Sequence, residues 1–193
     1  MEIIIHRVNN IERLRSIPRA YGCEIDIRAS GSELILNHEA FGGGERLVDY
    51  LDEYQHGIVI LNIKEAGIEE VVLSEVRKRQ ISEFFLLDVE FPYIYRAARA
   101  GERAIAMRYS EDESICTVLN YKGMVDWVWI DTNTRLPLDE DIVNQLQGFK
   151  TCLVCPERWN RPADIRHYKQ RIRDLHMDLT AVMTSEAYVD AWR

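Results

Sequence analysis

The sequence has 193 residues, of which 47% are hydrophobic and 29% charged, values typical of one soluble globular domain rather than a disordered or fibrous chain. Its 24 Lys and Arg against 32 Asp and Glu give a net charge of −8, which argues against a partner such as nucleic acid or anionic lipid. No apolar run reaches the roughly 18 residues of a membrane span, and residues 1–6 do not resemble a signal peptide. We therefore expect a cytoplasmic protein with reduced cysteines.

Short apolar runs alternate with amphipathic stretches along the whole chain. We expect strands at residues 3–5, 23–28, 57–63, 83–88, 103–108, 125–130, 151–155 and 179–183. We expect helices between and after them, at residues 10–21, 45–54, 68–79, 93–100, 113–121, 138–146, 162–175 and 187–192. Residues 33–38, after the turn at Ser30-Gly31-Ser32, either continue the second strand or form a separate piece.

Eight strand–helix units in a row predict a compact single-domain α/β protein, a (β/α)8 TIM barrel over residues 1–193. The strands are continuous apolar runs, as expected of parallel strands that are covered on both faces. At about 24 residues per unit, the loops should be shorter than in a typical barrel of roughly 250 residues. An open doubly wound sheet is the alternative, because alternation alone does not prove closure.

Charged and hydrogen-bonding residues stand at the end of almost every expected strand. They are His6, Arg7, Glu24, Asp26, Arg28, His38, Glu39, Asn62, Lys64, Asp88, Glu90, Arg108, Asp131, Glu157, Thr184 and Ser185. Because all strands of a parallel barrel point the same way, these ends should meet on one rim, where such folds carry their chemistry. Any one of them alone is more simply a solvated loop entrance. Together they indicate acid–base work on an anionic ligand.

Glu24 and Asp26 lie two residues apart on one expected strand and so share a face of the sheet. Two carboxylates so placed form half of a site for Mg²⁺ or Ca²⁺, although half-exposed strand carboxylates are a common alternative. His6 and His38 are candidates for proton transfer, and either could equally be structural. Cys152 and Cys155 are spaced like a metal or redox pair, but positions i and i+3 of a strand face opposite ways, so we expect core cysteines.

The order of these motifs resembles the glycerophosphodiester phosphodiesterase family of phosphodiesterase TIM barrels. His6-Arg7, Cys23-Glu24-Ile25-Asp26-Ile27-Arg28 and Leu36-Asn37-His38-Glu39 resemble the family's His-Arg-Gly, Glu-x-Asp-(V/I)-x and His-Asp motifs. Leu61-Asn62-Ile63-Lys64 resembles its later Glu-x-Lys. The motifs cover residues 1–65, and beyond them only the β/α rhythm supports a compact, divergent member.

The resemblance implies a divalent-metal-dependent phosphodiesterase that hydrolyses a small, soluble glycerol- or polyol-type phosphodiester. By the same resemblance, the ion, Mg²⁺ or Ca²⁺, is held by Glu24, Asp26 and Asn62. His6 and His38 would be the catalytic acid–base pair, and Arg7 and Lys64 would bind the substrate phosphate. These residue types suit the reaction, because cations must neutralise the phosphodiester anion and an imidazole exchanges protons near neutral pH.

Three departures from the family pattern leave other functions open. Val8 stands where the family has glycine, Asn9-Asn10-Ile11 where it has Glu-Asn-Thr, and Asn62 where it has glutamate. With two anionic ligands instead of three, affinity for a metal ion should fall. The alternative function is a catalytically divergent or inactive barrel that binds a phosphorylated ligand. A weaker third hypothesis is a barrel enzyme that uses Lys64 as a Schiff-base amine.

The oligomeric state is not decided by the sequence. The apolar residues Val71, Val72, Ile165 and Ile172 lie on expected helices, where they would pack either against the barrel or against a second copy in a homodimer. The physiological substrate and the native ion are likewise open.

Overall fold

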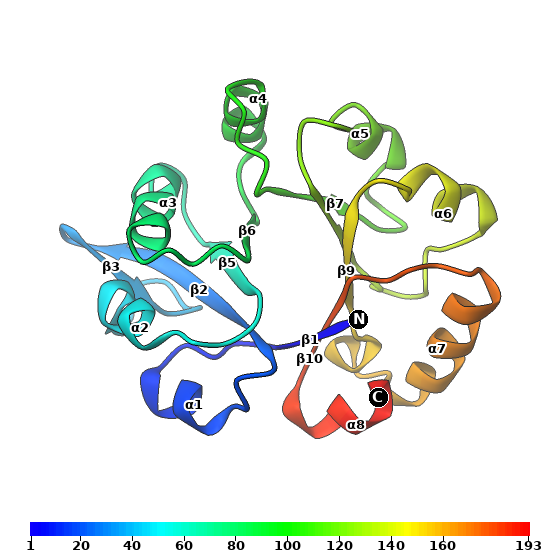
Figure 1. Ribbon diagram of the computed structural model, residues 1–193, viewed down its shortest axis with the longest axis horizontal. Helices are drawn as coiled ribbons and strands as arrows, with labels where there is room; N and C mark the ends of the chain where they lie inside the picture. The colour runs from blue at the N-terminus through cyan, green and yellow to red at the C-terminus, as the bar shows by residue number, and fades with distance from the viewer. The chain divides into compact units, whose positions relative to one another are not determined.

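The structure, a computed structural model, describes residues 1–193 and divides into two compact units. One unit comprises Ile4–Arg96, and the other comprises Met1–Ile3 together with Ala97–Arg193. Figure 1 shows the elements in chain order, with parallel strands followed by helices in each unit. None of the helices combines the length and the apolar character that a membrane crossing requires.

Four parallel strands form the sheet of Ile4–Arg96. In spatial order they are β1 (Glu2–Ile5), β2 (Gly22–Ser30), β5 (Val59–Ile63) and β6 (Phe84–Leu87). Every residue of β5 is buried, as are the first six residues of β2. The apolar runs therefore form parallel strands with both faces covered, as the sequence predicts.

An antiparallel hairpin extends the far end of β2. β3 (Glu33–Leu36) pairs with the second half of β2, from Ile27↔Leu36 to Ser30↔Glu33, and β4 (Glu45–Arg46) pairs with β3. Gly31, at a φ of 63°, makes the tight turn between them, a conformation that glycine adopts without strain. Residues 33–38 are thus a separate piece, and the hairpin determines where the segment with His38 begins.

The helices of this unit bury one apolar side each. α1 (Ile11–Ser16) is capped by the Asn10 side chain and ends well before residue 21, because Pro18 holds the preceding residue in an extended conformation. α2 (Leu47–Glu53) and α3 (Glu69–Lys78) lie side by side (Figure 1). α2 begins at Leu47 rather than at residue 45, because the two residues before it are paired in β4. α4 (Phe91–Arg99) contains the boundary between the units.

Four further parallel strands form the sheet of the second unit. Their spatial order is β7 (Ala106–Tyr109), β8 (Trp127–Ile130), β9 (Lys150–Val154) and β10 (Ala181–Thr184). The helices that follow these strands along the chain are α5 (Ile115–Leu119), α6 (Glu140–Leu146), α7 (Ile165–Asp174) and α8 (Val189–Trp192). Three short 3₁₀ turns, Pro156–Trp159, Pro162–Asp164 and Glu186–Tyr188, complete the unit. All eight expected strands are therefore present across the chain.

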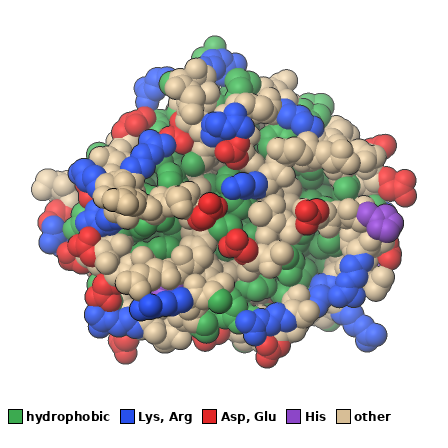
Figure 2. Space-filling view, viewed as in Figure 1, with side chains coloured by type: hydrophobic (Ala, Val, Ile, Leu, Met, Phe, Trp, Pro, Cys, Tyr) green, Lys and Arg blue, Asp and Glu red, His purple; other side chains and the backbone are tan.

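The residues considered for a homodimer contact mostly pack inside their own units. Val72 is fully buried on α3, and Ile165 and Ile172 are buried on α7. Only Val71, 52% exposed, is left at the surface. Acidic and basic side chains are interspersed on the face shown in Figure 2. These apolar residues therefore give no support to a dimer.

We predict that one of the four thiols reacts in the native chain. Cys116 is exposed, whereas Cys23, Cys152 and Cys155 are buried, and burial raises the pKa of Cys23 to about 12. Because the thiolate is the reactive form, a disulfide reagent should modify Cys116 quickly and the others only after denaturation. The measurement is the colour yield with Ellman's reagent in native and denaturing buffer. A fast native reaction that persists in Cys116→Ser would contradict the burial of the remaining cysteines.

Candidate active site

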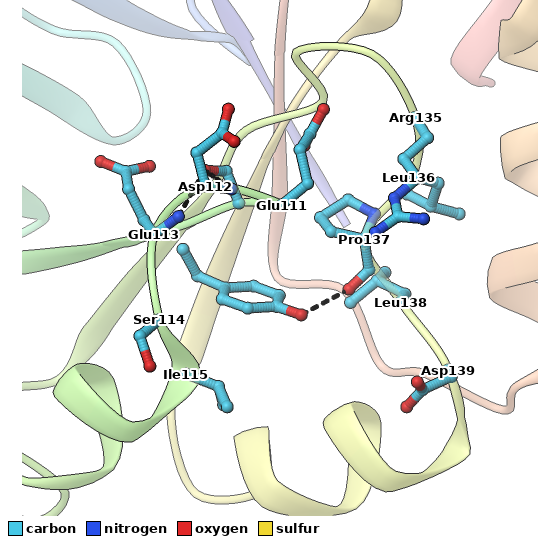
Figure 3. A pocket seen from close by; sticks show the side chains of 12 residues that line it. Glu111, Asp112, Glu113, Ser114, Ile115, Arg135, Leu136, Pro137, Leu138 and Asp139 are labelled. Atoms are coloured by element: carbon cyan, nitrogen blue, oxygen red, sulfur yellow. Dashed lines mark hydrogen bonds between the residues drawn. The ribbon is translucent and has the colours of Figure 1, made fainter.

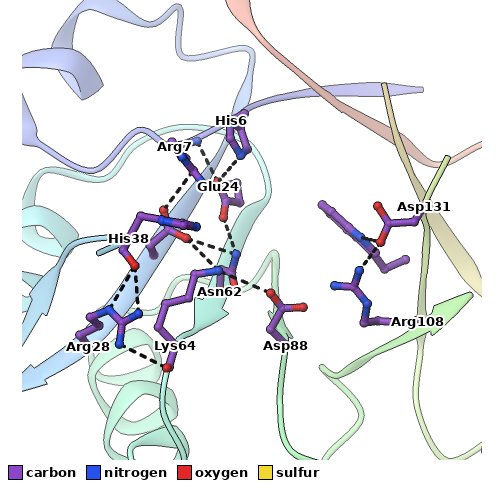
Figure 4. A network of polar contacts seen from close by, with 12 residues as sticks. His6, Arg7, Glu24, Arg28, His38, Asn62, Lys64, Asp88, Arg108 and Asp131 are labelled. Carbon is purple, nitrogen blue, oxygen red and sulfur yellow. Dashed lines mark hydrogen bonds and ion pairs between the residues drawn. The ribbon is translucent and has the colours of Figure 1, made fainter. Parts of the chain in front are cut away.

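The carboxylates of Glu24 and Asp26 lie side by side on β2 and are almost completely buried, at 2% and 0% exposure. Alternation along the strand places both on one face, next to the neighbouring strand β5. Asn62 on β5 lies opposite Asp26 in the register. Its Nδ2 donates to Glu24 Oε1 at 2.8 Å and to Asp26 Oδ1 at 3.3 Å, so a single nitrogen joins the two carboxylates (Figure 4).

The turn after β1 supplies further donors to the same two carboxylates. Arg7 has a left-handed φ of 53°, and its backbone N–H donates to Glu24 Oε2 at 2.8 Å. The Arg7 guanidinium lies 3.8 Å from Asp26 Oδ2. Val8 is buried and donates its own N–H to the Glu24 carbonyl at 2.9 Å. The left-handed residue of this turn is thus Arg7, so the turn forms without a glycine at position 8.

His6 lies at the carboxyl end of β1, beside the acidic pair. Its Nε2 is 3.9 Å from Glu24 Oε2, and its side chain is 14% exposed. This distance is longer than a hydrogen bond. The ring therefore lies beside the carboxylates and is accessible, rather than packed into the hydrophobic interior.

The hairpin brings the backbone of His38 beside the second half of β2. The backbone N–H of Asn37 donates to the Asp26 carbonyl at 3.0 Å, and the Arg28 guanidinium donates to the His38 carbonyl at 3.2 and 3.0 Å. The His38 Nδ1 lies 2.6 Å from Glu39 Oε1, and this contact lowers the pKa of Glu39. With Nδ1 donating to a carboxylate, Nε2 is the nitrogen that can accept a proton.

Lys64 follows β5 and has two acidic partners. Its Nζ lies 3.2 Å from Asp26 Oδ1 and 3.5 Å from Asp88 Oδ2, and its side chain is 15% exposed. Asp88 directly follows β6 and has a left-handed φ of 57°. Residues from the ends of β1, β2, β5 and β6 thus form one chain of contacts within this unit: His6, Glu24, Asn62, Asp26, Lys64 and Asp88.

Burial and repulsion between the acidic neighbours dominate the electrostatics of Glu24. Burial first, and then the charge of Asp26, raise the pKa of Glu24 to about 7. Hydrogen bonds from Asn62 and the Arg7 backbone, with the charge of Lys64, act in the opposite direction. A buried carboxylate with a raised pKa is typical of a functional site, although structural networks also produce one.

The residues fit a divalent cation through oxygen ligands. The ligands are not three side chains of the usual metal-binding types, because no group of three or more His, Cys, Asp or Glu is placed to hold a metal ion. The third oxygen would come instead from the amide of Asn62. Asn62 Oδ1 is a buried oxygen without a hydrogen-bond partner, next to two carboxylates. Two carboxylates and an amide oxygen are ligands that Mg²⁺ and Ca²⁺ accept. The donor set fits a divalent ion, with one negative ligand fewer than three carboxylates would give.

The second unit also carries polar contacts at its strand ends. Arg108, at the end of β7, forms an ion pair with Asp131 after β8 (Figure 4). Trp129 Nε1 donates to the same carboxylate at 3.0 Å. After β9, Glu157 Oε1 accepts from the Ser185 N–H at 2.7 Å. Within this unit the expected polar strand ends therefore contact one another in two separate pairs.

A cavity of about 510 Å³ lies between the loops that follow β7 and β8 (Figure 3). Its lining includes one guanidinium, that of Arg135, and four carboxylates, those of Glu111, Asp112, Glu113 and Asp139. Glu111 Oε1 joins the two loops by accepting from the Thr134 hydroxyl at 2.7 Å. An excess of negative charge disfavours a phosphodiester anion in this cavity.

Two residues that position the acidic pair and the hairpin were not predicted from the sequence. Asn9 donates from Nδ2 to Asp26 Oδ2 and accepts the Asp26 N–H on Oδ1, both at 2.8 Å. Arg28, expected only as a polar strand end, fixes the His38 backbone and also donates to the Lys64 carbonyl at 3.4 Å. The available signal for Asn9 was its place three residues after His6 in a turn rich in amides.

Comparisons with known proteins give similarity in structure but none in sequence family. No protein-family model and no curated protein matches the chain. Two solved structures from Agrobacterium tumefaciens are similar: one protein assigned as a glycerophosphoryl diester phosphodiesterase, and a glycerophosphodiester phosphodiesterase. The first has a TM-score of 0.69 at 10% identity, covering 100% of this chain and 96% of its own. The second has a TM-score of 0.63 at 16% identity, covering 94% and 95%.

At these identities the likeness establishes the fold. The chain has the (β/α)8 TIM-barrel fold of the glycerophosphodiester phosphodiesterases, as the sequence predicts. The resemblance seen in the first 65 residues therefore extends, as structure, over the whole chain. The likeness is to these barrels rather than to an open doubly wound sheet.

We predict that Glu24 makes the stability of the ion-free protein fall as the pH rises. Its pKa is higher in the folded chain than its ordinary value of 4.5, so its contribution is complete below about pH 4.5 and is lost as the pH approaches about 7. Relative to wild type, Glu24→Gln should gain up to about 3 kcal/mol over this range. The measurement is the free energy of unfolding by urea, in the presence of EDTA, at a series of pH values, with the exposed Glu12→Gln as control. If the free energy of unfolding of wild type and of Glu24→Gln changed in parallel with pH, the prediction would be wrong.

Proposed function

We propose that the protein is a divalent-metal-dependent phosphodiesterase that hydrolyses a small glycerol- or polyol-type phosphodiester. The observation that carries the proposal is the grouping of His6, Glu24, Asp26, Asn62 and Lys64 at the carboxyl ends of β1, β2 and β5. Acids, bases and cations thus converge where this fold carries its chemistry. The likeness in fold to two phosphodiesterases supports the same reaction class.

Glu24, Asp26 and Asn62 are the residues that would hold the ion. Bound there, Mg²⁺ or Ca²⁺ would supply positive charge to the phosphodiester as negative charge accumulates during transfer. Both carboxylates are buried and held by several donors, so they are fixed before any ligand arrives. A preformed pair of this kind reduces the ordering required on binding.

His6 and His38 would divide the proton transfers between them. One imidazole accepts the proton of the attacking hydroxyl, and the other donates a proton to the oxygen of the departing alcohol. The Glu39 contact holds His38 with Nδ1 protonated, which suits Nε2 to the accepting role. His6, whose Nε2 lies 3.9 Å from Glu24 Oε2, would then take the donating role.

Arg7 and Lys64 would bind the phosphate oxygens. Arg presents a planar fork of donors and Lys a compact charge, and both already lie at the edge of the acidic pair. Each is paired with Asp26, so a phosphate has to compete with that carboxylate for them. The cytoplasmic location and the choice between Mg²⁺ and Ca²⁺ stay predictions.

The second candidate is a catalytically inactive barrel that binds a phosphorylated ligand. Two observations favour it: an amide stands where a third carboxylate would strengthen ion binding, and both proposed phosphate ligands are occupied by Asp26. It predicts phosphate-ester binding without turnover in Mg²⁺, Ca²⁺ or Mn²⁺. Phosphorus NMR of a glycerol diester decides between the two, and a persistent cyclic phosphate would identify a substrate hydroxyl, rather than water, as the nucleophile.

We predict that His6→Ala and His38→Ala each lower kcat by at least about 100-fold, because each removes one proton-transfer group. His167→Ala, an exposed histidine on α7, is the matched control and should retain full activity. The measurement is steady-state turnover of a glycerol phosphodiester with saturating Mg²⁺. Equal activity in all three variants would remove the histidines from the mechanism.

We predict that Glu24→Ala abolishes ion binding, because it leaves one carboxylate and one amide oxygen. Isothermal titration with Mg²⁺ and Ca²⁺ measures binding directly and does not require a known substrate. The exposed Glu12→Ala should bind as the wild type does. Unchanged affinity in Glu24→Ala would show that the ion, if bound, lies elsewhere.

A further inference from the structure

The Asn62 side chain is the feature of this site that the proposed function leaves unexplained. It is 7% exposed, on β5 opposite Asp26, with its nitrogen turned toward the two carboxylates and its oxygen turned away. Oδ1 is buried and has no hydrogen-bond partner. Buried polar atoms of folded proteins are nearly always paired, so an unpaired amide oxygen needs a physical reason.

We propose that the Asn62 amide has two orientations and that the exchange between them controls the affinity of the acidic pair for a divalent cation. This inference rests on the proposed function. In the orientation seen here, the Nδ2 group donates to Glu24 Oε1 and Asp26 Oδ1 and takes the place of a bridging cation. In the other, the amide is turned by half a rotation about its terminal bond and Oδ1 becomes an ion ligand.

The charges around the amide couple each orientation to the state of the site. Without an ion, a nitrogen that faces two carboxylates forms two charge-assisted hydrogen bonds, whereas an oxygen there would be repelled. With a divalent ion between the carboxylates, the N–H group would be repelled and the oxygen would bind. The unpaired Oδ1 is then the atom that gains a partner when the amide turns.

The amide orientation should therefore weaken ion binding in this chain. An incoming ion has to displace the two hydrogen bonds from Asn62, and it also competes with the Lys64 ammonium, 3.2 Å from Asp26 Oδ1. A carboxylate at position 62 would have no such hydrogen bonds to displace, because it presents oxygen in both orientations, and it adds a negative charge. Affinity for Ca²⁺ and Mg²⁺ rises with the number of charged ligands and their preorganisation.

The test is Asn62→Asp, with the exposed Asn144→Asp on α6 as a control for the added charge. Isothermal titration with Mg²⁺ and with Ca²⁺ should show at least about 10-fold tighter binding in Asn62→Asp and wild-type affinity in Asn144→Asp. In EDTA, Asn62→Asp should have a lower Tm than wild type, because three neighbouring carboxylates repel one another without the amide donors. Added ion should then raise its Tm more than it raises that of wild type.

A second measurement uses the wild-type protein and so does not depend on folding of the variant. In protein labelled with ¹⁵N at asparagine, the Nδ2 resonances of Asn62 should shift on Mg²⁺ titration, because the amide loses its carboxylate acceptors. Asn144 should not shift.

The outcomes separate the two proposals. Equal ion affinity in wild type and Asn62→Asp, or an Asn62 amide that does not respond to bound ion, overturns the switch and leaves the ion site intact. Ion binding by neither protein overturns the metal dependence of the proposed function, and the switch with it. Tighter binding in Asn62→Asp with a responsive amide in wild type supports both.

Discussion

The burial of two neighbouring carboxylates on β2 is the constraint on which the rest of this site depends. Glu24 and Asp26 are removed from water and repel each other, a combination that a fold tolerates only when donors surround both groups. Those donors come from separate parts of the chain, namely the left-handed turn at Arg7, the amide of Asn62 and the ammonium of Lys64. The turn after β1 and the pairing of β2 with β5 thus both bring neutralising groups to the buried carboxylates.

On the proposed function, these neutralising groups are also the groups that a ligand would use, so a bound ligand would exchange one set of partners for another. Arg7 and Lys64 both pair with Asp26. A divalent cation held by the carboxylates would supply the positive charge that Arg7 and Lys64 now supply to Asp26. Ion and phosphate would then bind cooperatively, because the ion supplies the charge that Asp26 otherwise draws from the phosphate ligands.

The fold was predictable because buried parallel strands leave a strong pattern in the sequence. All eight expected strands are present, and their carboxyl ends carry the polar residues that the pattern indicated. Two helix boundaries differ from those expected, one because of strand pairing and the other because of a proline. Residues 45 and 46 look helical but pair with β3, and Pro18 ends α1 several residues earlier than the apolar spacing indicates. A local pattern contains no information on which strand will accept a segment, so the hairpin of β3 and β4 was left open.

The acidic pair was predictable from strand alternation alone, whereas the way it is held was not. Asn9 binds Asp26 through two hydrogen bonds, a contact that exists only because Arg7 adopts a left-handed conformation and turns the chain back over β2. Asn62 was expected as a weak ligand because it lacks a charge. The structure adds that its nitrogen, not its oxygen, faces the carboxylates. The important difference between an amide and a carboxylate at this position is the N–H donor of the amide. That donor lets the acidic pair remain buried when no cation is present.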